Sequence, residues 1–305
     1  MPDQADPAIL SAPPPTLSGF AALAGRYDVV LSDVWGVVHD GVAAFPRACA
    51  ALARYRAQGG VVVLITNAPR PSGPILAQLD GYGVPREAYD AVVSSGDVTL
   101  DLMAARGVAP VHFIGPPRDL TLFSELAETG APVPPQAPLA EAEYVVCSGL
   151  YDDFAETPAD YDPALDEMVR RGLDMVCANP DLVVHRGDDL LYCAGALAQR
   201  LEQKGGRAVY AGKPHPPIYE KALARARAAR AGRAPEAGRV LCIGDAVRTD
   251  LAGAAAQGFD ALFISYGIHR DELHEADGAL RPDALAALMA AAPRPPVGVM
   301  PQLWW

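Results

Sequence analysis

The sequence has no uncharged apolar run of about 18 residues, which excludes a membrane-spanning helix. Its first residues include Asp3 and Asp6 in place of the basic segment that opens a secretory signal, so we expect no secretion. Basic residues are also few. Lysine and arginine number 25 against 37 acidic residues, which gives a net charge of −12. This acidity disfavours nucleic acid and anionic membrane surfaces as partners.

Paired cysteines are missing as well. The five cysteines are scattered, odd in number and never spaced as Cys-x-x-Cys: Cys49, Cys147, Cys177, Cys193 and Cys242. Such spacing supports no zinc site. Because most of them lie inside apolar runs, we interpret them as buried free thiols and expect a reducing, cytoplasmic location.

The chain has 305 residues, of which 50% are hydrophobic. This is enough to build a sizeable core, and it excludes intrinsic disorder for most of the chain. The length favours two domains or one large α/β domain. The 28 glycines and 29 prolines predict many sharp turns.

Short apolar runs alternate with helical stretches. Strands are predicted at residues 29–33, 61–65, 240–243 and 261–264. Helices are predicted at 46–59, 216–232 and 249–258, the last capped by Thr249 and Asp250. Continuous apolar strands joined by helical crossovers are typical of a parallel sheet covered on both faces. The predicted fold class is therefore α/β with a doubly wound core.

The middle of the chain has its own strands, predicted at 111–114, 144–147 and 175–177, and clustered turn signals at 132–138. We therefore expect residues 98–207 to form an inserted α/β domain. The core then comprises 24–97 and 208–305, and residues 1–23 form an N-terminal arm. The chain ends in Trp304 and Trp305, which we expect to dock on the body of the protein, with docking on a partner as the alternative.

Polar side chains follow three of the predicted core strands. Asp33 ends the first, Thr66 and Asn67 follow the second, and Asp245 follows a later one; Lys213 adds a cation after a glycine. Ligands bind at the carboxyl ends of strands in open α/β sheets. Carboxylates can hold Mg²⁺, one carboxylate can attack phosphorus, and a hydroxyl and a lysine can hold phosphoryl oxygens.

Each of these residues has an ordinary interpretation when it is taken alone. Asp33 and Asp245 are acceptable turn residues, Thr66-Asn67 is acceptable in any loop, and Lys213 is acceptable on any surface. Their order and placement at the strand ends together favour phosphoryl-transfer chemistry.

The residues around these positions form four ordered motifs: Leu-Ser-Asp-Val-Trp-Gly-Val-Val-His-Asp-Gly at 31–41, Leu-Ile-Thr-Asn at 64–67, Gly-Lys-Pro at 212–214 and Ile-Gly-Asp-Ala-Val-Arg-Thr-Asp at 243–250. The set resembles the haloacid dehalogenase-like (HAD) hydrolases. The insertion looks like the α/β cap of subclass IIA, the NagD-like sugar phosphatases, with further matches at 178–181 and 194–197. The resemblance covers residues 24–275.

The resemblance implies a role for each matching residue. Asp33 is the expected nucleophile and a Mg²⁺ ligand. The other expected contributors to the metal site are the backbone carbonyl of Trp35, the carboxylate of Asp245 and, in support, Asp250.

The remaining implied residues surround the substrate. Thr66 and Asn67 are expected to bind the phosphoryl group, and Lys213 is expected to neutralise both the nucleophile and the phosphate. In the cap, Asn179 and Asp181 are expected near the leaving group.

One position departs from the family pattern. Phosphatases that it resembles carry an aspartic acid two residues after the nucleophile, which protonates the leaving group and activates water, whereas this chain has Trp35. Indole has one N–H donor and no acid or base function near neutral pH. Losing general acid–base help typically lowers the rate by about 10²–10⁴-fold. The ring itself either fills volume beside a turn or stacks on an aromatic leaving group.

Three interpretations of this departure stay open. Another residue replaces the acid, with His39, Asp40, Asp181 and His185 as candidates. Alternatively, the substrate is an aryl or acyl phosphate that needs little acid. In the third interpretation the protein binds a phosphorylated ligand and turns it over poorly or not at all.

From this sequence we expect a Mg²⁺-dependent phosphatase that acts on a small phosphate monoester (a sugar phosphate, nucleotide or cofactor phosphate) through an aspartyl phosphate. The alternative is a catalytically impaired phospho-ligand-binding protein on the same scaffold. A small-molecule phosphate ester is the expected partner, and a homodimer formed through the cap is compatible with the sequence.

Overall fold

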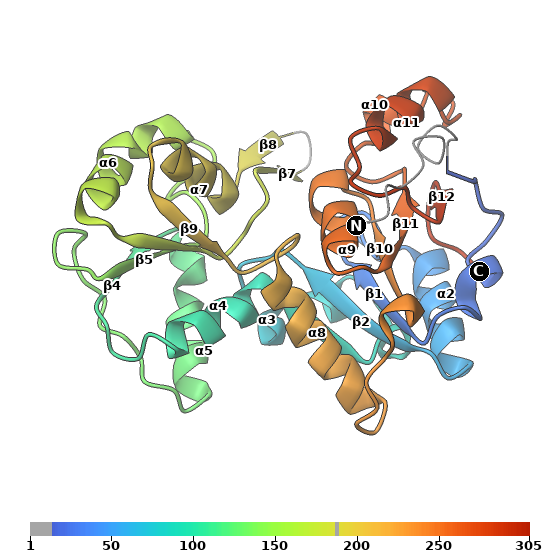
Figure 1. The fold of residues 1–305 in the computed structure, drawn as a ribbon, viewed down its shortest axis with the longest axis horizontal. Coiled ribbons are helices and arrows are strands. Elements are labelled where there is room, and N and C mark those ends of the chain that lie inside the picture. Colours follow the sequence, from blue (N-terminus) through green and yellow to red (C-terminus); the bar gives the residue numbers. More distant parts are fainter. Residues whose placement is uncertain (1–13, 187–188) are drawn as a thin grey trace, which may run out of the picture. The chain divides into compact units, whose positions relative to one another are not determined.

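The computed structural model describes residues 14–186 and 189–305 (Figure 1). They form two compact units. The first unit takes the described residues up to Leu64 together with Asp80–Ala91 and Leu223–Trp305. The second takes Ile65–Leu79 and Val92–Ala222.

A six-stranded sheet has the order β12-β11-β10-β1-β2-β3. Its strands are β1 (Val29–Asp33), β2 (Val61–Thr66), β3 (Ala91–Ser94), β10 (Val240–Gly244), β11 (Asp260–Ile264) and β12 (Gly298–Met300). The pairs β1–β10, β10–β11 and β11–β12 are parallel. All five residues of β1 and of β10 are buried, as expected for strands covered on both faces. The predicted strands and the α/β fold class are confirmed.

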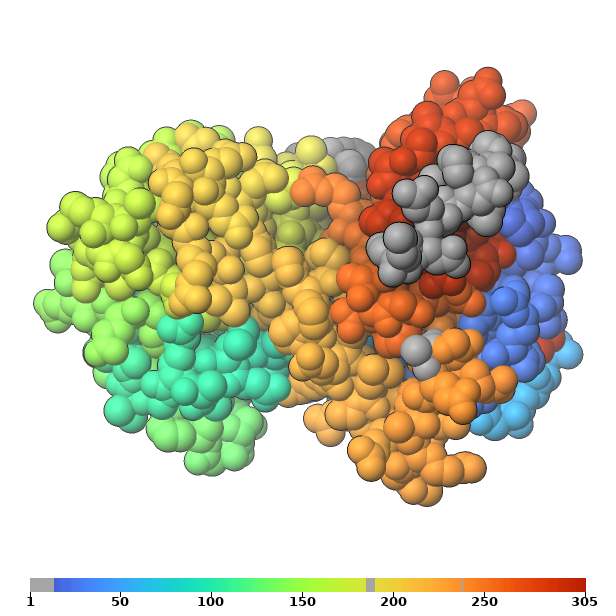
Figure 2. Space-filling model, viewed as in Figure 1, coloured from blue at the N-terminus to red at the C-terminus, as the bar shows by residue number. Residues whose placement is uncertain are grey.

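Helices and helical turns precede or connect these strands. They are α1 (Ala21–Ala24), α2 (Pro46–Ala57), α3 (Ser72–Gly81), η2 (Arg86–Ala88), α8 (Pro216–Ala229), η5 (Ala237–Arg239), η6 (Val247–Leu251), α9 (Ala252–Ala256), α10 (Arg270–Leu273) and α11 (Pro282–Met289). Figure 2 shows α10 and α11, in red, at the surface of the first unit, where most of their residues are exposed.

The predicted cap of the helix at 249–258 is wrong in detail. Residues 247–251 form a π-helical turn, η6, and α9 begins after it. The Asp250 carboxylate reaches back and accepts the N–H of Ala246 at 3.1 Å. Asp250 therefore closes the turn that follows β10 and is not the N-cap of α9.

The second unit contains a four-stranded parallel sheet with the order β4-β5-β6-β9. Its strands are β4 (Val111–Ile114), β5 (Tyr144–Cys147), β6 (Asp174–Cys177) and β9 (Arg207–Tyr210), and a separate antiparallel pair is formed by β7 (Val183–Arg186) and β8 (Asp189–Tyr192). The helical elements are α4 (Ser95–Ala104), η3 (Pro117–Leu120), α5 (Thr121–Glu128), η4 (Pro158–Tyr161), α6 (Asp162–Arg171) and α7 (Ala194–Gln203).

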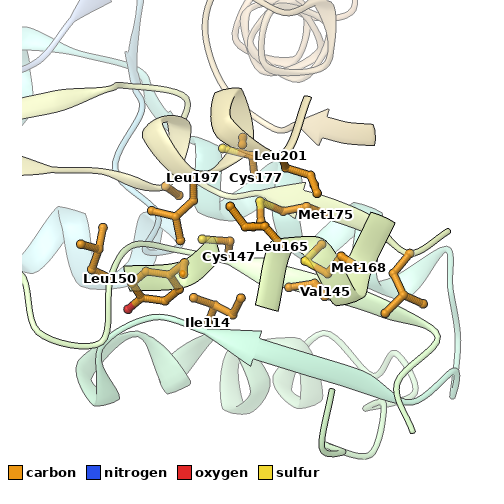
Figure 3. Packing of buried hydrophobic residues seen from close by; sticks show 14 residues of the cluster. Ile114, Val145, Cys147, Leu150, Leu165, Met168, Met175, Cys177, Leu197 and Leu201 are labelled. Atoms are coloured by element: carbon orange, nitrogen blue, oxygen red, sulfur yellow. The ribbon is translucent and has the colours of Figure 1, made fainter. Parts of the chain in front are cut away.

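Side chains of this sheet alternate between two apolar clusters. Val145, Cys147 and Met175 pack with Leu165 of α6 and Leu197 of α7 on one face (Figure 3). The intervening strand residues belong to a second cluster with residues of α4 and α5: Tyr144, Val146 and Val176. Alternation along each strand thus supplies both faces of the sheet with a core.

The boundary between the core and the inserted domain depends on whether the sheets or the two compact units define it. By sheet membership, β3 belongs to the six-stranded sheet and β9, which ends at Tyr210, to the four-stranded sheet. By compactness, Ile65–Leu79 and the segment that starts at Val92 belong to the second unit. The expected boundaries at 97/98 and 207/208 therefore stay a prediction.

The C-terminal tail docks on the protein's own first unit. Leu17 donates its N–H to Val299 at 2.9 Å, and Phe20 meets the Trp305 ring edge-on at 5.9 Å. The guanidinium of Arg54 lies over Trp305 at 4.6 Å. The expectation that the terminal tryptophans dock on the body is confirmed, and part of the predicted N-terminal arm forms the docking surface. The portion of the arm at 1–13 lies outside the described residues.

No helix among the described residues combines the length and the apolar character needed to cross a bilayer.

The docked tail predicts a measurable contribution to stability. Trp305→Ala removes an edge-on ring pair and a cation–π contact, which together contribute about 1–2 kcal/mol. We expect thermal denaturation to show a midpoint lower by a few degrees. Val42, which is 81% exposed, provides the control, because Val42→Ala is expected to leave the midpoint unchanged. Equal midpoints for Trp305→Ala and the unsubstituted protein would show that the tail contributes nothing.

Candidate active site

Three buried carboxylates lie together in the first unit. Asp33 ends β1, Asp245 directly follows β10, and Asp250 lies in the π-helical turn. One carboxylate oxygen from each residue lies within 4.8 Å of the other two. We call these three residues the carboxylate cluster. The structure thus brings together the acidic residues that the sequence predicted for the metal site.

The sheet register explains why Asp33 meets the other two. β1 and β10 are parallel neighbours, with Ser32 opposite Ile243, so their carboxyl ends coincide. Asp33 accepts the N–H of Val34 at 2.7 Å through Oδ1, a bond that fixes the carboxylate relative to the loop.

Two glycines allow the backbone to approach Asp245 closely. A Cβ at Gly36 would lie 2.2 Å from Asp245 Oδ2, and a Cβ at Gly267 would lie 2.0 Å from it. Ile268 donates its N–H to the same oxygen at 2.7 Å. We did not predict Gly36, Gly267 or Ile268 as site residues. The only sequence signal was the glycine inside the first motif, and nothing marked residues 267 and 268.

Asp250 is held by a similar close approach. Its side chain lies over Gly244, where a Cβ would come within 2.1 Å of the Asp250 Cγ. Its Oδ2 also accepts the N–H of Ala246. One oxygen of Asp250 is therefore held by the backbone, and its supporting role at a metal site stays a prediction.

The cluster fits a hard divalent cation. Neighbouring buried carboxylates repel each other, and burying them is unfavourable unless cationic groups or a metal ion offset their charge. Carboxylate oxygens are the donors that Mg²⁺ and Ca²⁺ prefer. Asp33, Asp245 and Asp250 could together hold one such ion. The backbone carbonyl of Trp35 as a further ligand stays a prediction.

The loop after β1 carries Trp35 and two titratable side chains. His39 is 4% exposed and its Nδ1 accepts the N–H of Gly41 at 2.9 Å. Burial lowers the pKa of His39 to about 4, so the imidazole is neutral near pH 7. The N–H groups of Ala43 and Val42 lower the pKa of Asp40 by donating to its carboxylate. Neither side chain therefore carries, near neutral pH, the proton that a general acid must supply.

The second unit contains the other predicted site residues. Asn67 accepts the N–H of Lys213 at 2.7 Å through Oδ1, and its Nδ2 donates to the Lys213 carbonyl at 3.1 Å and to Asp181 Oδ1 at 2.9 Å. Asn67 is 4% exposed and Lys213 2%. Asn179 in turn accepts the N–H of Asp181 at 3.1 Å. The structure thus brings Asn67, Lys213, Asn179 and Asp181 together through direct bonds.

The bonds of Asn67 favour a positioning role for its side chain. A carboxamide has two N–H donors, and both are used here by Lys213 and Asp181. Its expected role as a phosphate ligand stays a prediction. Thr66 accepts the N–H of Ala68 at 3.2 Å through its hydroxyl oxygen, and its expected role as a phosphate ligand stays a prediction.

Comparisons with known proteins identify the family of this chain. The family described as haloacid dehalogenase-like hydrolase matches residues 30–130, and a related HAD-hydrolase-like family matches 210–292. A solved structure of a haloacid dehalogenase-like hydrolase from Brucella suis 1330 is 43% identical, covers 94% of this chain and 99% of that chain, and has a TM-score of 0.81.

Two further relatives have names that state an activity. The ribonucleotide monophosphatase NagD of Escherichia coli K12 is 26% identical over 246 residues, which are 78% of this chain and 88% of NagD. The glycerol phosphate phosphatase of Mycobacterium tuberculosis, solved with calcium, is 26% identical, covers 80% of this chain and 68% of that chain, and has a TM-score of 0.61.

The close approach at Gly36 predicts a loss of cation binding on substitution. Gly36 has a φ of +77°, and in Gly36→Ala the new methyl group displaces Asp245. We expect the affinity for Mg²⁺, measured by titration calorimetry, to fall about 10–100-fold. Gly83 has a φ of +81° with nothing within 4 Å of its Cβ position. Gly83→Ala therefore carries the same backbone strain but leaves cation affinity unchanged. Equal affinities in the two variants would contradict this explanation.

The bonds of Asn67 predict a loss of activity on an isosteric change. Asn67→Asp keeps an oxygen for the Lys213 N–H but removes both donors and adds a charge beside Asp181. Because small displacements of a catalytic group can lower the rate about 10²-fold, we expect kcat to fall by about that factor. Steady-state kinetics measure it, with circular dichroism to confirm folding. An unchanged kcat would show that Asn67 does not position Lys213.

Proposed function

Because this chain belongs to the haloacid dehalogenase-like hydrolases and is similar to their NagD-like phosphatases, we propose that it hydrolyses a small phosphate monoester through an aspartyl phosphate on Asp33. The observation that carries the proposal is the carboxylate cluster at the coincident carboxyl ends of β1 and β10. It supplies a nucleophile and a cation site at one edge of the sheet, where ligands of open α/β sheets bind.

The first step of the proposed reaction belongs to Asp33. Its carboxylate oxygen forms a bond to phosphorus while the bond from phosphorus to the ester oxygen breaks, and the electron pair leaves with that oxygen. The oxygen of a water molecule then bonds to phosphorus, the bond from phosphorus to the Asp33 oxygen breaks, and phosphate and a proton are released, which restores the carboxylate. The hydrogen bond from Val34 to Asp33 Oδ1 orients the carboxylate for attack.

Asp33, Asp245 and Asp250 are the residues that would hold Mg²⁺ in this proposal. A bound divalent cation supplies neutralisation of the negative charge on the phosphate and on the nucleophile. The backbone contacts to Asp245 and Asp250 keep both carboxylates in place during the reaction.

Thr66 and Lys213 are proposed to bind the phosphoryl oxygens. A lysine is rarely buried unless charged or polar groups accompany it, and Lys213 is 2% exposed. Its ammonium group would stabilise the charge that develops on the transferring phosphoryl group. The bonds of Asn67 to the backbone N–H and carbonyl of Lys213 fix the backbone from which this side chain extends.

The substrate is proposed to be a small phosphate monoester. The related proteins are named for ribonucleotide monophosphates and for glycerol phosphate, which are both small esters of this kind. Asn179 and Asp181 are proposed to contact the leaving group, since they join Asn67 in one bonded group. The names of these relatives favour a phosphatase over a phospho-ligand-binding protein.

Removal of the nucleophile tests the proposal. We expect Asp33→Asn to lower phosphate release from 4-nitrophenyl phosphate at least about 10³-fold, because an amide is a poor nucleophile and a weaker cation ligand. Asp40→Asn is the control: Asp40 is exposed, and the amide oxygen can still accept the N–H groups of Val42 and Ala43.

Chelation provides the second arm of the same test. Treatment with EDTA should abolish phosphate release and added Mg²⁺ should restore it. Full activity in Asp33→Asn would overturn the nucleophile assignment. Tight binding of phosphate compounds with no turnover in the unsubstituted protein would support a binding protein instead.

A further inference from the structure

The side chain of Trp35 stands two residues after the proposed nucleophile and is 44% exposed. Its six-membered ring lies against Gly41, where a Cβ would come within 2.3 Å of the indole Cη2. The His39 ring meets it edge-on, with 5.3 Å between the ring centroids. The indole is therefore held in place by its own loop while nearly half of its surface stays open.

The two titratable side chains of this loop, His39 and Asp40, form hydrogen bonds that hold the loop in its conformation. His39 packs against both Trp35 and Tyr82 and accepts the N–H of Gly41 through Nδ1. Asp40 accepts two backbone N–H groups through a single oxygen, Oδ1. Both side chains act as hydrogen-bond acceptors that shape the turn.

The other loop that touches the carboxylate cluster contains Ile268 and His269. Ile268 donates its N–H to Asp245, so this loop also borders the site. The Nδ1 of His269 lies 3.0 Å from Glu272 Oε2, and its ring lies beside Phe263. In the described residues 34–44 and 265–270, each histidine and acidic side chain outside the cluster therefore already has a partner within its own unit.

We propose, on the premise of the phosphatase activity above, that no side chain, Asp181 included, protonates the departing oxygen. With Trp35 in place of an acid, the enzyme is limited to phosphates with acidic leaving groups, and the exposed indole stacks on the ring of aryl leaving groups. A phenol ionises near pH ~10, whereas an alkyl alcohol, like bulk water, ionises only near ~16. An aryl oxygen can therefore leave as an anion without a proton donor. A fixed, exposed indole offers a flat ring a stacking surface.

The reaction balances without an acid in the loop. An Asp33 oxygen bonds to phosphorus, the bond from phosphorus to the aryl oxygen breaks, and the aryloxide leaves with the electron pair. The aryloxide takes its proton from bulk water after it departs. In the second step a water oxygen bonds to phosphorus, the bond from phosphorus to the Asp33 oxygen breaks, and the proton lost by the water passes to the phosphate or to bulk solvent. This step does not depend on the leaving group.

The dependence of the rate on leaving-group acidity tests the proposal in the unsubstituted protein. The panel comprises 4-nitrophenyl, phenyl and 4-methoxyphenyl phosphates, glycerol 3-phosphate and acetyl phosphate, with saturating Mg²⁺. We expect kcat/KM to fall steadily as the leaving-group pKa rises, and to be at least about 10²-fold lower for glycerol 3-phosphate than for 4-nitrophenyl phosphate. Acetyl phosphate has an acidic leaving group but no ring, so we expect a kcat similar to that of 4-nitrophenyl phosphate with a higher KM.

Three variants separate the roles of the ring and of the missing acid. In Trp35→Ala, kcat/KM should still fall steeply as the leaving-group pKa rises. The KM for aryl esters should rise about 3–10-fold, which corresponds to the loss of an aromatic pair. Trp35→Phe should bring the KM for aryl esters most of the way back to that of the unsubstituted protein. Trp35→Asp should supply an acid and so raise the turnover of glycerol 3-phosphate about 10-fold or more. The dependence of kcat/KM on the leaving-group pKa should therefore become weaker. Thermal denaturation and Mg²⁺ titration show whether each variant is folded and retains its cation site.

The outcomes distinguish this inference from the proposed function. Hydrolysis of glycerol 3-phosphate within a few-fold of 4-nitrophenyl phosphate, abolished by Asp33→Asn, would overturn the inference alone, because another residue would then supply the proton. An unchanged KM for aryl esters in folded Trp35→Ala would overturn the stacking role. Absence of phosphate release from every ester would overturn the inference together with the proposed function.

Discussion

The crowding of three buried carboxylates is the constraint on which the rest of the site depends. Asp33, Asp245 and Asp250 bring oxygens within 4.8 Å of one another in a part of the first unit where little water can screen them. Like charges at such distances destabilise the folded chain unless cationic groups offset them. The close-packed glycines and the backbone N–H donors are explained by this requirement, because they fix each carboxylate against repulsion. Gly36, Gly244 and Gly267 all lie where a side chain would occupy the space of an acidic group.

In the second unit, the buried charge of Lys213 also has to be held in a fixed position. A buried ammonium group needs a fixed position if it is to stabilise a phosphoryl group, and its own flexible chain does not provide one. The structure fixes the backbone of Lys213 through Asn67, which bonds to both its N–H and its carbonyl, and Asn67 in turn donates to Asp181. One carboxamide therefore couples the lysine to the segment that we propose contacts the leaving group. A change in that segment is expected to reach Lys213 through Asn67.

The sequence predicted the strands and the positions of the acidic residues because both depend on local patterns. Runs such as residues 61–65 are apolar throughout, which is typical of strands buried on both faces. Asp33 is the last residue of such a strand, and Asp245 directly follows another. The sequence could not reveal the contacts of Gly267 with Asp245, because that proximity is created by the tertiary fold between residues 22 positions apart. The π-helical turn was also missed, since neither its backbone bonds, such as that from Leu251 to Ala246, nor the bond from Ala246 to Asp250 leaves a pattern in the sequence. Nor could a motif show that both donors of Asn67 are used by the protein itself.

The most direct test of the central claim, that the carboxylate cluster is a divalent cation site, is a crystal structure determined with Mn²⁺ and recorded at the manganese absorption edge. Mn²⁺ takes the same oxygen ligands as Mg²⁺ and scatters anomalously. The account predicts one strong anomalous peak bounded by oxygens of Asp33, Asp245 and Asp250. That peak should be lost in crystals of Asp245→Asn. A well-ordered cluster without such a peak, or a peak held by other residues, would contradict the account.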